Sequence, residues 1–144
     1  MRHGEAGEAR SDAERPLTLR GRSQALASAR GLHALGVRVP RIWCSPYLRA
    51  RQTADIVASV FGSSVDEDAR FVPGGNPESA AEAVVNARDG VFVVAHMPIL
   101  PGVVEVLAGG RASFGTAAVA HVAVVGGTGF LVGLFSSEFL EHVR

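Results

Sequence analysis

Val91-Phe92-Val93-Val94-Ala95 is a run of five apolar residues, and His96 follows it without a break. A strand inside a parallel sheet that helices cover on both faces carries apolar side chains on both sides, so it lacks the alternation of a half-exposed strand. The run therefore predicts a central parallel strand that is buried on both faces. Asp89-Gly90 directly precedes the run and is typical of a turn.

Helical patterns flank this strand on both sides. Residues 76–78 (Asn-Pro-Glu) combine a capping residue, a proline for the first turn and an early acid, which together are a strong helix start. We expect this helix to end near Arg88, and we expect a second helix over residues 99–108, after the strand. A strand between two helices is the repeating unit of α/β proteins.

The first half of the chain shows the same alternation of helix and strand. Thr18 is a capping residue, and Leu26, Ala29 and Leu32 follow at a spacing that turns them toward a core. Gly62 follows a second helical pattern and is a typical helix stop. We expect a helix from 18 to about 35, a strand over 41–44 and a helix over 47–61, with loops at 4–17 and 63–76.

Residues 119–125 and 130–135 flank a Gly-Gly-Thr-Gly segment, a pattern that predicts a hairpin near the end of the chain. Helices that alternate with strands, followed by a hairpin, predict an α/β fold. We expect a three-layer α/β/α sandwich with a mostly parallel central sheet and a C-terminal hairpin. No repeat or linker is visible in the sequence, so residues 1–144 are expected to form a single domain.

The composition is that of a compact folded protein without a global charge. The 144 residues are 47% hydrophobic and 19% charged, and 14 basic residues balance 14 acidic ones. A neutral chain has no field that attracts nucleic acid or an anionic membrane, so we expect neither as a partner. One cysteine suits a reducing compartment, and no apolar run is long enough to span a bilayer. We expect a cytoplasmic monomer.

Three polar segments are expected at the carboxyl ends of strands, where open α/β sheets bind their ligands. His96 ends the apolar run, and residues 45–49 (Ser-Pro-Tyr-Leu-Arg) follow the strand over 41–44. Arg2-His3-Gly4 completes the set if it also follows a strand. Two guanidinium groups and two imidazoles at one place suit a dianionic phosphoryl group. One imidazole attacks phosphorus while the other groups neutralise its oxygens.

These motifs resemble the histidine phosphatase superfamily, also called phosphoglycerate mutase-like. The resemblance rests on Arg2-His3-Gly4, on residues 45–53 (SPYLRARQT) and on the strand-terminal His96. Residues 15–18 (RPLT) with Gly21, and residues 94–98 (VAHMP), are similar to the small SixA-type phosphohistidine phosphatases within the superfamily. The similarity runs from residue 2 to about 125, and the short chain has no insertion that forms a cap.

The resemblance implies a role for each matching residue. His3 is implied as the nucleophile, which carries a transient phosphohistidine. Arg2, Arg49 and His96 are implied to line the phosphate pocket around it.

Arg15 and Gly4 are implied to assist the same pocket. Arg15 reaches it from the loop before the first helix, and Gly4 lets the backbone pass close to the imidazole and orient it through a main-chain carbonyl. Members of this family use no metal, and the sequence has no cluster of residues at metal-ligand spacing. We therefore expect no metal and no cofactor.

Many superfamily members protonate an alcohol leaving group with a carboxylic acid, and that acid is missing here. Met97 follows His96, Arg70 stands where the acid is often found, and Glu78 belongs to a helix start. Imidazole leaves phosphorus more easily than an alkoxide does, so a phosphohistidine substrate needs less acid catalysis.

We therefore expect the substrate to be phosphohistidine on a histidine phosphotransfer domain of a signalling relay. One alternative is a small phosphate ester, such as a sugar or nucleotide phosphate. Another is an inactive pseudophosphatase that only binds phosphate or a phosphoprotein.

The superfamily normally has an apolar strand before the Arg-His-Gly tripeptide, but only Met1 stands there. A truncated first strand leaves its neighbours without ladder partners, and His3 without a rigid element to aim it. One explanation is that the chain starts here, with a sheet that is damaged or completed by a partner. The explanation we favour is that Met1 is an internal methionine and that the functional polypeptide extends upstream.

Overall fold

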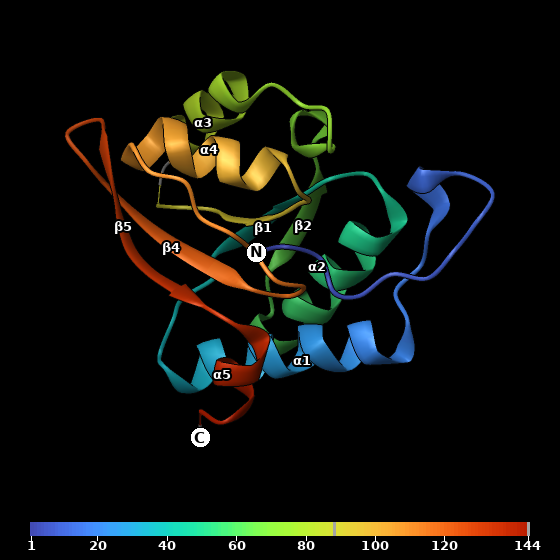
Figure 1. Cartoon of the computed structure of the whole chain (residues 1–144). Helices are drawn as coiled ribbons and strands as arrows, with labels where there is room; N and C mark the ends of the chain where they lie inside the picture. Colours follow the sequence, from blue (N-terminus) through green and yellow to red (C-terminus); the bar gives the residue numbers. More distant parts are fainter. Residues whose placement is uncertain (88, 144) are drawn as a thin grey trace.

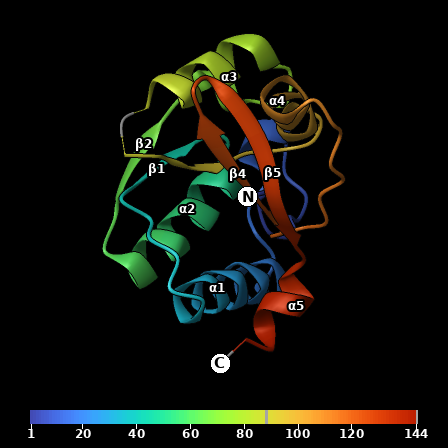
Figure 2. The same cartoon turned by 90° about the vertical axis from the view of Figure 1, so that its left-hand side faces the viewer.

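Helices cover both faces of a parallel sheet, which confirms the three-layer prediction (Figures 1 and 2). The computed structural model describes residues 1–87 and 89–143. In chain order the elements are η1 (Asp12–Glu14), α1 (Leu19–Ala34), β1 (Arg41–Cys44), α2 (Leu48–Phe61), β2 (Ser64–Glu67), η2 (Ala69–Phe71), α3 (Pro77–Asn86), β3 (Phe92–Val94), α4 (Ile99–Ala108), β4 (Val119–Val125), β5 (Thr128–Phe135) and α5 (Ser137–Glu141). α3 and α4 lie on one face of the sheet, and α1, α2 and α5 lie on the other.

The parallel sheet has the strand order β2-β1-β3. β2 occupies part of the segment 63–76, for which the sequence predicted a loop, so that prediction was wrong. Three of the four β2 side chains are exposed, because the strand lies at the edge of the sheet. A short edge strand rich in polar residues lacks the apolar pattern from which strands are predicted.

β3 is the parallel strand that the apolar run predicts, but its burial is uneven. Val94 is fully buried, as is Ala95 after it, whereas Phe92 and Val93 are half-buried. The prediction of burial on both faces therefore holds only at the carboxyl end of the run. That end leads directly into His96.

The first three residues extend the sheet on the side of β3 that faces away from β1. The Met1 nitrogen donates a hydrogen bond to the Val93 carbonyl oxygen (2.7 Å). The Ala95 N–H donates to the Met1 carbonyl, and the His3 N–H donates to the Ala95 carbonyl, both at 3.0 Å. Only Arg2 is formally paired, in a parallel bridge to Ala95. The strand at this place is thus as short as the sequence predicts.

The same segment joins β3 to the C-terminal hairpin. The Arg2 N–H donates to the Ala118 carbonyl (3.0 Å), and the Ala117 N–H donates to the His3 carbonyl (3.1 Å). Both main-chain polar groups of His3 are therefore hydrogen-bonded, one to each neighbouring segment. We expected His3 to lack a rigid mount, but the structure differs, because these two neighbours hold its main chain in place.

The predicted capping residues begin their helices. The Thr18 hydroxyl oxygen accepts a hydrogen bond from the Gly21 N–H (2.9 Å) at the start of α1. The Asn76 side-chain oxygen accepts one from the Ser79 N–H (2.8 Å) at the start of α3. The helix end predicted near Arg88 lies outside the described residues, and α3 ends two residues before that position.

α1 buries small side chains where the sequence predicted a leucine. Ala29 and Leu32 are buried as predicted, but Leu26 is half-buried and Ala25 is fully buried instead. Ala25 belongs to the buried core cluster that also holds Ala29 and Leu32.

The hairpin turn is two residues long, shorter than predicted. Gly126 and Gly127 both have positive φ angles (57° and 80°), which the common two-residue hairpin turn requires, and β5 begins at the next residue. The sequence did not predict α5, a short helix that follows β5 and packs against α1.

The segment after His3 crosses the start of α1 at a distance that only glycine allows. A Cβ atom at Gly4 would lie 2.3 Å from the Gly21 carbonyl oxygen, and a Cβ atom at Gly21 would lie 2.0 Å from the Glu5 carbonyl oxygen. The Thr18 N–H also donates to the Glu5 carbonyl at 3.0 Å. The two glycines therefore set the separation between the His3 segment and α1.

Replacing Gly21 by alanine is expected to lower the free energy of unfolding by about 3 kcal/mol, because the new methyl group collides with a main-chain oxygen. Gly74→Ala is the matched control, since a Cβ atom there meets open space. Urea denaturation of both variants measures the effect. Equal unfolding midpoints for the two variants would contradict the close crossing of Gly4 and Gly21.

Candidate active site

A pocket of about 440 Å³ opens at the carboxyl ends of β1 and β3. The residues predicted for the site that line it are Arg2, His3, Arg15, Arg49 and His96. The sixth, Gly4, contacts the His3 ring through its carbonyl oxygen and does not line the wall. The elements position these side chains as the sequence suggests, since His96 follows β3 and Arg49 lies in the first turn of α2.

Two contacts hold the His3 ring in one orientation. Nδ1 lies 2.7 Å from the Gly4 carbonyl oxygen, and Nε2 lies 3.2 Å from Nε of Arg49. The carbonyl can only accept, so Nδ1 carries the proton; the guanidinium nitrogen can only donate, so Nε2 presents its lone pair. Both contacts therefore favour the same tautomer, in which the unprotonated Nε2 meets the guanidinium group of Arg49.

Burial lowers the pKa of His3 to about 4. Loss of solvation is the largest cause, and the positive charges of the neighbouring arginines add to it, although the hydrogen bond to Gly4 acts in the opposite direction. Only 8% of the residue is exposed. At neutral pH the ring is therefore uncharged, and the lone pair of Nε2 is not lost to a proton.

Arg49 is nearly buried and connects His3 to the loop that precedes α1. Its Nε donates to His3, while Nη1 donates to the Asp12 carbonyl oxygen and Nη2 donates to the Asp12 carboxylate (3.0 Å). The guanidinium group also lies over the Tyr47 ring, 5.3 Å from its centroid.

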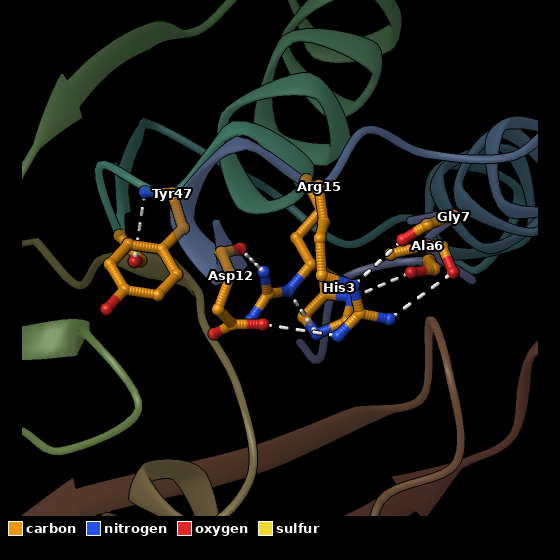
Figure 3. Close-up of polar contacts among 9 residues, drawn as sticks. His3, Ala6, Gly7, Asp12, Arg15 and Tyr47 are labelled. Carbon is orange, nitrogen blue, oxygen red and sulfur yellow. Dashed lines mark hydrogen bonds and ion pairs between the residues drawn. The ribbon is translucent and has the colours of Figure 1, made fainter. Parts of the chain in front are cut away.

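Asp12 joins two arginines at the mouth of the pocket (Figure 3). Its Oδ1 accepts a hydrogen bond from Arg15 Nη1 (3.2 Å), and its Oδ2 accepts one from Arg49. Arg15 is held further by the Gly7 carbonyl, which accepts from Nε at 2.8 Å. The hydrogen bond from Arg49, with a second from Arg15, holds the pKa of Asp12 below its usual value. The carboxylate is therefore ionised at neutral pH.

His96 is 1% exposed, and neither ring nitrogen has a hydrogen-bond partner among the described residues. Its ring centroid lies 5.0 Å from that of His3 and 5.2 Å from that of Tyr47. Burial, followed by the charges of His3 and Arg49, lowers the pKa of His96 to about 3. A buried polar group without a partner costs free energy, so these nitrogens are suited to bind a ligand.

Arg2 reaches the pocket from the central sheet. Its Nη1 donates to the Phe114 carbonyl (2.8 Å), whereas its buried Nε finds no acceptor in residues 1–87 or 89–143. Loss of solvation, with repulsion from Arg49, lowers the pKa of Arg2. Two arginines that crowd one pocket, with a buried N–H left over, favour an anionic ligand.

Sequence reasoning missed Thr53 and Asp12. The Gly4 N–H donates to the Thr53 hydroxyl oxygen (3.2 Å), and this hydroxyl donates to the Arg49 carbonyl (2.8 Å). The spacing of four residues between Arg49 and Thr53 on a predicted helix was an available signal. Asp12 lies in a segment without periodicity, so no local pattern pointed to it.

A general acid would have to be a carboxyl group at the pocket without an arginine partner, and none of Glu5, Arg70 and Glu78 fits this description. Glu5 lines the wall but pairs with Arg20, with 3.4 Å between the charged atoms. Arg70 hydrogen-bonds to Asp68, and Glu78 lies in the first turn of α3, so neither Arg70 nor Glu78 lines the pocket.

Among residues 1–87 and 89–143, no group of three or more His, Cys, Asp or Glu side chains is placed to hold a metal ion. No helix among them is both long enough and apolar enough to cross a bilayer.

Comparisons with known proteins agree with the geometry of the pocket. A family model described as the histidine phosphatase superfamily (branch 1) matches residues 1–72. The chain is 33% identical to the phosphohistidine phosphatase SixA of Escherichia coli (strain K12) over 131 residues, which cover 85% of this chain and 81% of that protein. It is 31% identical to the SixA homolog of Haemophilus influenzae (strain ATCC 51907 / DSM 11121 / KW20 / Rd) over 125 residues, or 77% and 76% of the two chains.

The fold is also similar to a solved structure of the protein histidine phosphatase SixA complexed with tungstate. The TM-score is 0.90 at 29% sequence identity, and the match covers 95% of this chain and 94% of that one.

The buried, neutral His96 predicts that acid destabilises the fold. Above pH 6.5 the imidazole is uncharged in both the folded and the unfolded chain; below it, only the unfolded chain takes up a proton, because the folded-state pKa is about 3. Between pH 7.5 and 5.0 this difference lowers the free energy of unfolding by about 2 kcal/mol. Urea denaturation at both pH values should therefore show a smaller loss for His96→Gln than for the wild type, and equal losses would contradict it.

Proposed function

The chain belongs to the histidine phosphatase superfamily (branch 1) and is a phosphatase, and from this membership we propose that it hydrolyses phosphohistidine on a partner protein. The proposed nucleophile is His3. The observation that carries the proposal is the fixed tautomer of this residue, whose unprotonated Nε2 lies in a pocket lined by arginines. A neutral imidazole with a directed lone pair is the form that attacks phosphorus.

In the proposed first step, the lone pair of His3 Nε2 forms a bond to phosphorus. The bond between phosphorus and the substrate imidazole nitrogen breaks, and that nitrogen keeps the electron pair and takes up a proton from solvent. Arg2, Arg49 and His96 face the three remaining oxygens of the phosphoryl group. Their fixed N–H donors stabilise the charge that develops there without reorganisation.

In the proposed second step, water attacks phosphorus on the side that the leaving group has vacated. The bond to His3 Nε2 breaks and this nitrogen keeps the electron pair, the water loses a proton to solvent, and inorganic phosphate and free enzyme result. The Gly4 carbonyl keeps the proton on Nδ1 throughout, so His3 returns to the same tautomer.

The state of the nearby carboxylates supports phosphohistidine as the substrate. Asp12 is ionised and bound to two arginines, so it is not a protonated acid at neutral pH, and Glu5 is paired with Arg20. An alkoxide leaving group needs such an acid much more than an imidazole does. The similarity to the phosphohistidine phosphatase SixA of Escherichia coli points to the same substrate class.

Trapping of the phosphoenzyme tests the proposal directly. A histidine phosphotransfer domain that carries radiolabelled phosphohistidine is mixed with the wild type, and the reaction is quenched in alkali. We expect a label on the enzyme that is stable in alkali and lost in acid, as a phosphoramidate bond is. His3→Ala should carry no label, because the attacking nitrogen is gone.

His33→Ala is the matched control, because His33 is an exposed histidine on α1 and lies outside the pocket. It should be labelled as the wild type is. Label that persists on His3→Ala would refute His3 as the nucleophile. A wild type that is labelled by a small phosphate ester but not by the phosphoprotein would refute the proposed substrate. A wild type that binds phosphate but is never labelled would favour a binding protein.

A further inference from the structure

The guanidinium group of Arg49 has an inner and an outer edge, and the two edges contact different residues. The inner edge, Nε, donates to Nε2 of His3 at 3.2 Å. The outer edge, formed by Nη1 and Nη2, donates to the main-chain oxygen and the carboxylate of Asp12. The group is planar and rigid, so contacts that fix its outer edge also fix the direction of the inner N–H bond.

The inner N–H bond points to the place where the phosphoryl group must bind. Nε2 of His3 can attack phosphorus only when its lone pair is released from the hydrogen bond to Arg49. A phosphoryl oxygen then accepts the hydrogen bond from that N–H, which stays close to its present position. Asp12 contacts Arg49 on the opposite edge, so it can influence the reaction through Arg49 without contact with the reacting atoms.

We propose that Asp12 is a positioning residue, whose carboxylate holds the outer edge of Arg49. Held in this way, Nε–H of Arg49 can donate to a phosphoryl oxygen while the phosphoryl group is transferred to His3 and then to water. The same carboxylate tethers Arg15 through Nη1 (3.2 Å), so one side chain sets the place of two cations. This inference rests on the proposed function, because it assigns Asp12 to the same phosphoryl-transfer site.

The surroundings of Asp12 favour a functional role over a packing role. Its side chain is 54% exposed, whereas that of Arg49 is 5% exposed. Asp12 belongs to η1, which contains no buried residue. An ion pair with one exposed partner adds little to stability, so the contact matters more for the direction of Arg49 than for the free energy of unfolding.

The same contacts would also fit a plug, that is, a carboxylate that competes with phosphate for the same arginine nitrogens. In that role, Asp12 must move away before phosphate can bind. The two roles predict opposite effects. Removal of a plug tightens phosphate binding, whereas loss of a positioning contact weakens it. Affinity for inorganic phosphate therefore separates them.

Two variants of Asp12 that match in charge isolate the positioning contact. Asp12→Asn and Asp12→Ala both remove the negative charge, but only asparagine keeps an oxygen that can accept from Arg49 Nη2. We expect kcat/KM for dephosphorylation of a phosphohistidine protein to be about 10- to 100-fold lower in Asp12→Ala than in Asp12→Asn, the usual effect of removing a residue that orients a ligand-binding group. Affinity for inorganic phosphate, measured by calorimetry, should fall in the same order.

Glu14→Gln is the control within the same turn. Glu14 accepts a hydrogen bond from the Ser11 hydroxyl (2.8 Å), which glutamine can keep, and it does not line the pocket. Its activity and phosphate affinity should match those of the wild type.

An Arg49→Ala background separates positioning from damage to the loop. In that background Asp12→Asn and Asp12→Ala should have equal phosphate affinities, because the residue through which Asp12 acts is absent. A difference of about tenfold that persists there would overturn the proposal, as would an Asp12→Ala variant that binds phosphate as tightly as Asp12→Asn does. A wild type that binds phosphate but leaves the phosphohistidine protein intact would count against the proposed function alone, since the phosphate affinities still decide the role of Asp12.

Discussion

Main-chain hydrogen bonds from residues 1–3 join β3 to the C-terminal hairpin, and the pocket is built around this junction. His3 uses its N–H toward one neighbour and its carbonyl toward the other, so its Cα has little freedom. The side chain of His3 lies against His96, which follows β3. The main chain of His3 is hydrogen-bonded to the residue between β3 and His96. Two imidazoles from distant parts of the sequence are thus brought together by a ladder only a few residues long. These main-chain bonds fix the place from which the His3 side chain starts, and the contacts with Gly4 and Arg49 then orient its ring.

Burial then decides the charges of the pocket. Loss of solvation is the largest cause of the lowered pKa of both histidines, so both are neutral where an exposed imidazole would be partly charged. The arginines face uncharged rings, and the carboxylate of Asp12, which is bound to Arg49, lies at the exposed mouth of the pocket. A dianion that enters therefore meets the positive charge of the arginines and the unprotonated Nε2 of His3. This arrangement keeps the candidate nucleophile unprotonated beside the cations that an anion needs.

Two residues of this pocket could be placed from the sequence because each follows a recognisable element. His96 ends an apolar run, and Arg49 follows a short strand and opens a helix. Asp12 could not be predicted, because its segment has no periodicity and its importance arises from contact with a residue 37 positions away. β2 was missed for a related reason, since an edge strand with exposed polar side chains has no apolar pattern. The mount of His3 was misjudged because main-chain pairing with residues 95, 117 and 118 leaves no trace in the local sequence.

The crossing of Gly4 and Gly21 behind the pocket tolerates far less change than the segment at its mouth. A side chain added at either glycine would collide with a main-chain oxygen, so the segment that carries His3 cannot move away from α1 without loss of this contact. Residues 8–14 are exposed along their whole length and border the cavity through Asp12. Insertions or substitutions in residues 8–14 would reshape the entrance while the crossing stays as it is. Residues 8–14 are therefore the segment to change in order to fit this pocket to a bulkier phosphorylated partner.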